Sequence, residues 1–131
     1  MEATRILSDR KLSITAGRMR ILSVLLESSV ALSEKEIRSR LQGDCDRATV
    51  YRTLKTFTEK DIVHPVITEN LTTKYVIKKA PENHLHFKCT ACDKVYCMTT
   101  VKLSSYSLPE GFVQTDTNFL VTGICKACNR Q

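Results

Sequence analysis

Apolar residues in the first part of the chain recur every three or four positions, which is the period of an amphipathic helix. Between residues 16 and 27 the recurring positions are Met19, Leu22, Leu25 and Leu26. They predict a core helix, and Thr15 suits its N-cap because the hydroxyl can accept a hydrogen bond from a helical amide. A shorter apolar face predicts another helix over residues 3–10.

Two more helices are predicted close together after this one. Ser33 and Glu36 have the spacing of a capping box and predict a helix over residues 34–42. Gly43 follows it and suits the left-handed conformation that ends many helices. Asp46 is the next N-cap, so we expect a tight turn and then a new helix.

The helix predicted over residues 47–60 has an apolar face and a basic face. Its expected inward positions are Ala48, Val50, Leu54 and Phe57. A second face carries Arg47, Tyr51 and Lys55 at four-residue spacing, with Arg52 beside them. Helix, tight turn, helix is the helix-turn-helix pattern, and such side chains can contact the bases and phosphates of DNA. The alternative is a solvated helix whose basic face touches nothing.

Runs of β-branched and aromatic residues then predict two strands, over residues 62–67 and 74–78, joined by a hairpin loop. Pro65 indicates that the first is an edge or irregular strand. A hairpin after these helices is the order of a winged helix, which we expect over residues 1–79. Residues 80–83, Ala-Pro-Glu-Asn, interrupt the pattern and are the predicted linker.

The rest of the chain predicts a small mixed domain over residues 84–131. The expected elements are strands over residues 84–89 and 94–98, a short helix over 101–106, a turn at 109–111 and further strand within 112–124. The predicted fold class is therefore α+β: an N-terminal winged helix-turn-helix followed by a small α+β domain.

Two Cys-x-x-Cys pairs mark this second part, Cys89 with Cys92 and Cys125 with Cys128. Zinc takes four soft ligands in a tetrahedron, and two such pairs supply them. We therefore predict one structural zinc site, with two disulfides or four unrelated thiols as the alternatives. Because 42% of the residues are hydrophobic and none is tryptophan, the core is modest and a structural metal would offset that shortfall.

Charge and composition narrow the function classes. The net charge of +6 is concentrated in residues 1–80, which carry fifteen Lys or Arg and ten Asp or Glu, against five and four in residues 81–131. This bias favours a polyanionic partner for the first part. The charged N-terminus, six cysteines and short apolar runs predict a cytoplasmic protein with no signal peptide and no membrane partner.

Together these motifs resemble those of the ferric uptake regulator family. Residues 47–57 are similar to its recognition helix, and Thr15 with Arg18 to its N-terminal motif. Residues 84–95 and 123–128 are similar to its metal-binding part. The resemblance spans nearly the whole chain. It implies a homodimeric, metal-dependent repressor that binds operator DNA, with a C-terminal dimerisation domain and no small-molecule substrate beyond the metal ion.

The resemblance also assigns roles to residues. Tyr51 and Arg52 fall where family members touch the major groove. The full expected set of DNA contacts is Arg18, Arg47, Thr49, Tyr51, Arg52 and Lys55. The four paired cysteines fall on the family's structural zinc site. His84 and His86 fall on two ligands of its regulatory site, where a second divalent metal binds.

Several ligand positions depart from the family pattern. The usual His-His-Asp-His is Asn-His-Leu-His over residues 83–86, and a glutamate after the Lys-Val pair is Cys97. Other usual ligands are replaced by Ile77, Ala31 and Thr117. The resemblance therefore implies that the auxiliary oxygen-rich site is lost and that His84, His86 and Cys97 form the regulatory set.

Strand alternation places His84 and His86 on one face, with Leu85 and Phe87 expected to point into the core. Two imidazoles and a thiolate are softer donors than imidazole with carboxylates. They favour zinc as the regulatory metal, with iron as the alternative.

Other function classes fit less well. Zinc deaminases pair His-x-Glu with Pro-Cys-x-x-Cys, whereas this chain has His-x-His and no proline before either cysteine pair, so we expect no enzyme. The alternatives kept open are a zinc-ribbon adaptor that binds protein, and a thiol redox-responsive regulator that uses Cys97 or Cys45.

Overall fold

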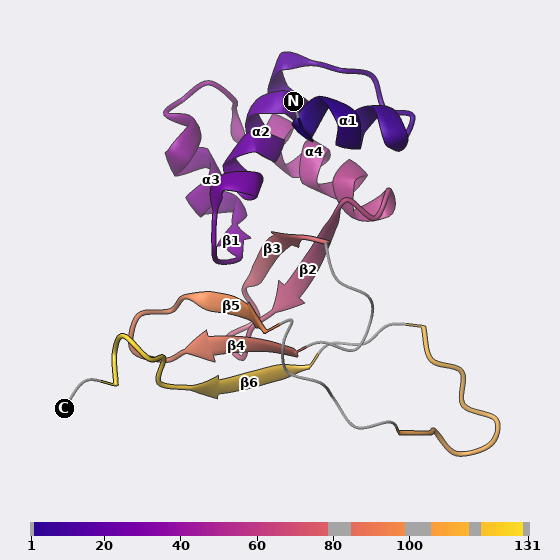
Figure 1. The fold of residues 1–131 in the computed structure, drawn as a ribbon, viewed down its shortest axis with the longest axis vertical. Coiled ribbons are helices and arrows are strands. Elements are labelled where there is room, and N and C mark those ends of the chain that lie inside the picture. The colour runs from indigo at the N-terminus through magenta and orange to yellow at the C-terminus, as the bar shows by residue number, and fades with distance from the viewer. Residues whose placement is uncertain (1, 79–84, 99–105, 116–118, 130–131) are drawn as a thin grey trace. The chain divides into compact units, whose positions relative to one another are not determined.

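The computed structural model describes residues 2–78, 85–98, 106–115 and 119–129 (Figure 1). The chain divides into two compact units, Met1–Lys79 and Ala80–Gln131, each with its own small sheet. Among the residues described, no helix is long and apolar enough to cross a membrane.

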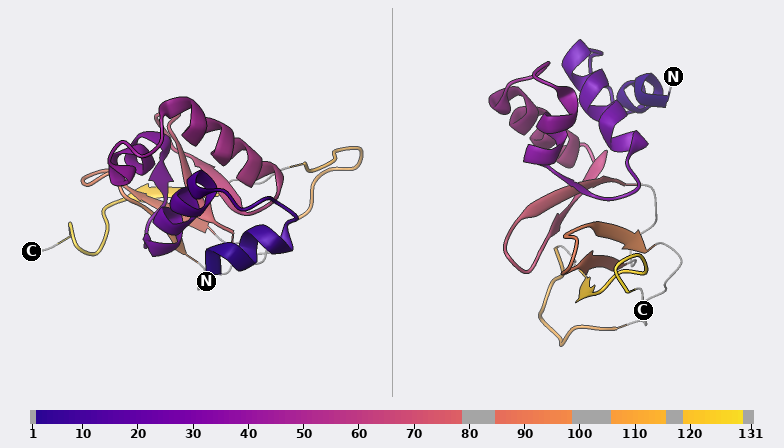
Figure 2. Two further views of the ribbon diagram at one scale, coloured as in Figure 1. Left: turned by 90° about the horizontal axis from the view of Figure 1, so that it is seen from above. Right: turned by 90° about the vertical axis from the view of Figure 1, so that its left-hand side faces the viewer.

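The first unit is built on helices whose positions agree with the sequence patterns. These helices are α1 (Glu2–Asp9), α2 (Ala16–Glu27), α3 (Glu34–Leu41) and α4 (Arg47–Glu59). The core packs α2 against both α3 and α4 (Figure 2). Its fully buried members include Leu7, Ile21, Leu22, Ile37, Val50, Leu54 and Phe57. The expected apolar stripe of α2 is confirmed, with Met19 and Leu26 half-buried at its edge and Ile21 added to its centre.

One inward position of α4 was predicted wrongly. Ala48 is exposed, and Thr53 is buried in its place. Val50, Thr53, Leu54 and Phe57 follow the i, i+3, i+4, i+7 pattern of one helix face. Ala48 lies two residues before Val50, about 200° around the helix, and so faces the opposite side.

The turn between α3 and α4 takes two left-handed residues. Gln42 has φ 54° and caps α3, and Gly43 follows with φ 88°. The sequence placed the left-handed residue at Gly43 alone, so the helix ends one residue earlier than expected. Asp46 then caps α4, and its carboxylate accepts a hydrogen bond from the Thr49 N–H at 2.8 Å.

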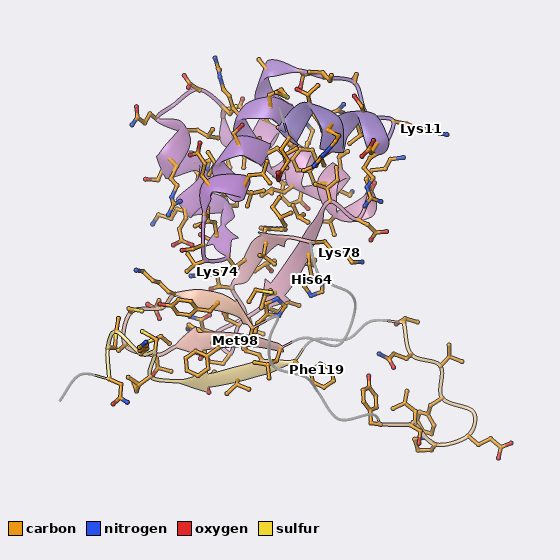
Figure 3. The ribbon with its side chains drawn as sticks, in the orientation of Figure 1. Lys11, His64, Lys74, Lys78, Met98 and Phe119 are labelled. Carbon is orange, nitrogen blue, oxygen red and sulfur yellow. The ribbon has the colours of Figure 1, made fainter. Side chains whose placement is uncertain are left out.

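A three-stranded antiparallel sheet completes the first unit in the order β1-β3-β2. Its strands are β1 (Leu32–Ser33), β2 (Val63–Ile67) and β3 (Thr73–Ile77). The predicted hairpin is confirmed, and β2 is an edge strand, where Pro65 costs no ladder hydrogen bond. The two-residue β1 was not predicted, because it is too short to show an alternating pattern. Figure 3 labels His64 on β2 and Lys74 on β3.

The second unit has a sheet in the order β5-β4-β6. Its strands are β4 (Leu85–Cys89), β5 (Val95–Met98) and β6 (Leu120–Gly123). β5 runs antiparallel to β4, whereas β6 runs parallel to it. Figure 3 labels Met98, which ends β5, and Phe119, which precedes β6.

Two expected elements of the second unit lie partly on residues that the structure does not describe. For the helix predicted over residues 101–106, residues 101–105 lie outside the described residues. Tyr106 is described, and it is not helical. The strand expected within residues 112–124 is confirmed as Leu120–Gly123, and residues 112–115 are not part of it. Phe112 and Val113 have the right residue types for a strand, but they are exposed, and no strand in the described part of the chain pairs with them. The predicted turn is present, with the Phe112 N–H donating to the Pro109 carbonyl at 3.2 Å.

The capping box of α3 provides a test of the local structure. The Ser33 hydroxyl accepts from the Glu36 N–H at 3.1 Å, and the Glu36 carboxylate accepts from the Ser33 N–H at 2.8 Å. Ser33→Ala should lower the free energy of unfolding of the first unit by about 1 kcal/mol, because one amide loses its partner. Ser39→Ala, in the exposed middle of the same helix, is the control and should change little. Thermal denaturation at fixed zinc measures both, and equal effects would contradict the capping assignment.

Candidate metal centre and nucleic-acid interface

The sheet of the second unit brings the two cysteine pairs together. β4 ends at Cys89, and Cys92 lies in the turn that leads to β5. β6 lies parallel to β4 with Gly123 opposite Cys89, so the chain leaves both strands at the same edge. Cys125 and Cys128 follow directly. Gly123 also packs closely on β4, since a Cβ at this position would lie 3.2 Å from the Phe87 ring.

The four thiols have the geometry of a tetrahedral site. Their Sγ atoms all lie within 4.8 Å of one another, and Cys92 and Cys125 are 3.9 Å apart. Zinc–sulfur bonds of about 2.3 Å at tetrahedral angles separate ligand sulfurs by about 3.8 Å. The alternative of disulfides is not supported, because every cysteine is a free thiol and this distance is about twice a disulfide bond. The cluster therefore fits a structural zinc site.

Backbone amides favour the thiolate form of two of these ligands. The N–H groups of Cys125 and Cys92 each donate to Cys89 Sγ at 3.4 Å, and they lower the Cys89 pKa to about 6. The Cys128 N–H lowers the pKa of Cys125 in the same way. Cys128 has a pKa raised to about 12, chiefly by its hydrogen bond with Cys125, because a thiol beside thiolates keeps its proton. A bound cation would reverse that preference, since zinc binding releases thiol protons.

Tyr96 is a member of this centre that the sequence patterns missed. It lies on β5, and its hydrogen bond with Cys125 raises the Tyr96 pKa to about 12, so the hydroxyl keeps its proton and donates it. The same contact lowers the pKa of Cys125. No Cys-x-x-Cys motif includes this position, and only the strand pairing brings it to the sulfurs.

The regulatory set is described only in part, because His84 lies outside the described residues. His86 and Cys97 are directly opposite on β4 and β5. The Cys89 N–H donates to Lys94 on the β5 side, whereas the His86 N–H donates to Phe119 on the β6 side. His86 and Cys97 therefore form a non-hydrogen-bonded pair, in which the Cα atoms are about 4.5 Å apart and the side chains share a face.

The expectation that Leu85 and Phe87 point into the core is wrong. Both are half-buried, whereas His86 and Lys88 on the other face are 2% and 5% exposed. Strand alternation was predicted correctly, but the apolar residue type pointed to the wrong face. Lys88 is accommodated by an ion pair with Asp93 at 3.4 Å.

The second candidate surface lies on α4. The side chain of Arg47 is 81% exposed and Tyr51 is 61% exposed, and Lys55 is exposed one turn further along. Arg52 is also exposed, whereas Thr49 is half-buried. The predicted ridge is therefore present as a continuous basic and aromatic face.

Arg18, the remaining predicted DNA contact, lies on α2. It is half-buried, and its guanidinium donates to the carbonyl and the hydroxyl of Ser13, both at 2.9 Å. These two hydrogen bonds hold the Arg18 guanidinium against the loop that precedes α2. In the Thr15 N-cap, the hydroxyl accepts from the Arg18 N–H, as expected.

A shallow depression beside the ridge contains an acidic residue that sequence reasoning did not single out. Glu34, Arg47, Ala48 and Tyr51 line it. The Glu34 carboxylate is 3.1 Å from Arg38 Nε and 3.8 Å from Arg47 Nε.

Comparison with known proteins identifies the family. No curated protein sequence matches the chain. Among solved structures, the Helicobacter pylori ferric uptake regulator aligns with a TM-score of 0.66 and 21% identity over 99% of this chain and 91% of its own. The Vibrio cholerae ferric uptake regulator gives 0.67 and 22% over 93% and 98%.

A zinc uptake regulator complexed with zinc and DNA gives a TM-score of 0.71 and 19% identity over 97% of this chain and 90% of its own. At these identities the structural similarities show a shared fold. The sequence model of the ferric uptake regulator family matches residues 9–108, which is more than half of the chain. The chain therefore belongs to the ferric uptake regulator family.

Proposed function

We propose that this protein is a metal-responsive transcriptional repressor that binds operator DNA as a cytoplasmic homodimer. The observation that carries the proposal is the exposed ridge of Arg47, Tyr51 and Lys55 on the second helix of a helix-turn-helix. A basic helix face that also presents an aromatic side chain can contact both phosphates and base edges of DNA.

The two units divide the work in this proposal. The DNA-binding domain is residues 1–79, and the dimerisation domain is residues 84–131. Residues 80–83 are the linker that joins them. The boundary between the compact units, after residue 79, supports this division. Exposed apolar side chains in the second unit support the dimer, because a partner would cover them; they are Phe112, Val113, Val121 and Ile124.

In the DNA complex, α4 enters the major groove. Tyr51 and Arg52 reach base edges, while Arg18, Arg47, Thr49 and Lys55 contact bases or phosphates. The similar fold of a zinc uptake regulator complexed with zinc and DNA supports DNA as the ligand. A zinc-ribbon adaptor that binds protein would leave the ridge without a role.

Tyr51 and Lys55 should affect DNA binding differently. Tyr51→Ala should reduce the preference for operator over random DNA about tenfold, because an aromatic edge that packs on a thymine methyl reads sequence. Lys55→Ala should weaken binding to both operator and random DNA, because a phosphate contact is lost. It should also lower the slope of log affinity against log salt concentration by about one. Fluorescence anisotropy against salt measures both. If both variants weaken operator and random DNA equally and slightly, α4 does not enter the groove.

Cys89, Cys92, Cys125 and Cys128 hold the structural zinc in this proposal. All four positions of the ion are then filled by protein, so it has no open site for a substrate water, which argues against an enzyme. The zinc supplies a crosslink between the end of β4 and the segment after β6.

Loss of one cysteine ligand of the zinc should unfold the second unit or dissociate the dimer. Cys92→Ser should lose the zinc and dissociate or unfold, because the metal contributes folding free energy that the small core does not. Cys45→Ser, which changes a cysteine of the first unit, is the control and should keep one zinc per chain. Metal analysis and size-exclusion chromatography measure both, and a stable zinc-free dimer of Cys92→Ser would refute the assignment.

The regulatory site uses His84, His86 and Cys97 for a second divalent metal. The cross-strand pairing of His86 with Cys97 supports it, since both side chains lie on one face of the sheet. Two imidazoles and a thiolate favour zinc over iron. The same Cys97 thiolate could instead be oxidised, which keeps a thiol redox-responsive regulator as the second candidate.

Removing the regulatory donors should abolish the metal response and spare the fold. Replacing both His84 and His86 with alanine should leave the structural zinc and the dimer intact, while DNA affinity no longer rises with free zinc. Cys97→Ser should lose part of the response. A control is His64→Gln, which changes the one histidine of the sequence that is not in the regulatory set. DNA affinity titrated against buffered zinc measures all four proteins, and an unchanged response in the double variant would place sensing elsewhere.

A further inference from the structure

The depression on the proposed DNA-binding surface contains a carboxylate where phosphates are expected to approach. Glu34 is the first residue of α3, and Arg47 is the first residue of α4. The rest of α3 and the turn separate these two positions in sequence, but the Glu34 carboxylate lies 3.8 Å from Arg47 Nε. Glu34 therefore lies beside Arg47 and Tyr51, two residues of the exposed ridge.

Glu34 is held more firmly than the arginine it faces. Its side chain is 23% exposed, and its carboxylate accepts from Arg38 Nε at 3.1 Å, one turn along α3. Arg47 is 81% exposed and lies 3.8 Å away through its Nε. A contact of this length on the surface is loose, so it biases the direction of the Arg47 side chain without fixing it.

The charge of Glu34 also reaches the sheet behind the ridge. Tyr75 on β3 is half-buried, and its pKa is raised first by burial and then by the charges of Tyr51 and Glu34. Three elements therefore meet around this carboxylate: the start of α3, the start of α4 and β3 of the hairpin.

We propose that Glu34 is a specificity-determining residue of the DNA-binding surface, which directs Arg47 to a base edge and disfavours phosphate at this position. This inference rests on the proposed function. The Nε side of Arg47 faces Glu34, and the two terminal amino groups are those that bind the O6 and N7 of a guanine bidentately.

The carboxylate acts against non-specific binding as well. An exposed arginine at the start of a recognition helix can bind any backbone phosphate, which adds affinity without sequence information. A negative charge beside it repels phosphate and leaves a neutral base edge as the favourable partner. Specificity is a difference between two affinities, and such a repulsive element raises it by weakening the wrong complex.

Glu34→Gln tests the inference because it removes the charge and keeps the size of the side chain. The probes are a duplex selected by the zinc-loaded parent from a randomised pool, and a random duplex of equal length. The variant should bind the random duplex more tightly, with a steeper salt dependence, and its preference for the selected duplex should fall about tenfold. In an Arg47→Gln background, Glu34→Gln should reduce the preference no further.

Two controls separate this role from structure and net charge. Glu59→Gln removes an exposed carboxylate at the other end of α4 and should leave the preference unchanged. Glu110→Gln makes the same charge change in the second unit and should also leave it unchanged. Circular dichroism and zinc content confirm that each variant is folded.

The outcomes distinguish the two proposals. A parent that selects no duplex overturns the repressor function itself. A parent that discriminates, together with a Glu34→Gln variant whose preference stays within about twofold of it, overturns the role of Glu34 alone. A selection with the variant adds a further check, since base preference should relax at the position that Arg47 reads.

Discussion

The second unit depends on the convergence of four cysteine sulfurs at one edge of a three-stranded sheet. Its described residues include few buried apolar side chains: Val95 and the cysteines Cys89 and Cys125. A sheet this small buries too little surface to offset the entropy of ordering its chain. Structural zinc contributes about 10–16 kcal/mol in small zinc domains. A zinc ion bound by the four thiols would therefore take the place of a hydrophobic core.

The first unit depends on ordinary packing instead. Its helices bury a continuous cluster of leucine, isoleucine, valine and phenylalanine side chains, and every helix from α2 to α4 begins at a side-chain cap. This leaves one face of α4 available for a ligand. Ion pairs at its margin, Glu34 with Arg38 and Glu36 with Lys74, decide where positive charge is exposed. In the proposed function, the two units thus separate DNA recognition from metal binding.

Much of this arrangement could be predicted from local sequence signals. Caps at Thr15, Ser33 and Asp46 located the helix starts, and Cys-x-x-Cys spacing located the four thiols that come together. Apart from Ala48, whose position on its own helix was misjudged, the misses at the two sites depend on neighbours distant in sequence. Leu85 and Phe87 were assigned to the core by residue type, but the fold buries His86 and Lys88 instead. Tyr96 lies in its site only through strand pairing, and Glu34 only through the packing of α3 against α4.

X-ray absorption at the zinc edge tests the central claim most directly, because it reports the ligands of the bound ion in the intact protein. With one zinc per chain, the account predicts a first shell of four sulfurs at about 2.3 Å and no lighter ligand. Zinc added beyond one per chain should then introduce nitrogen donors at about 2.0–2.1 Å. A first zinc bound through nitrogen or oxygen, with fewer than four sulfurs, would contradict the account.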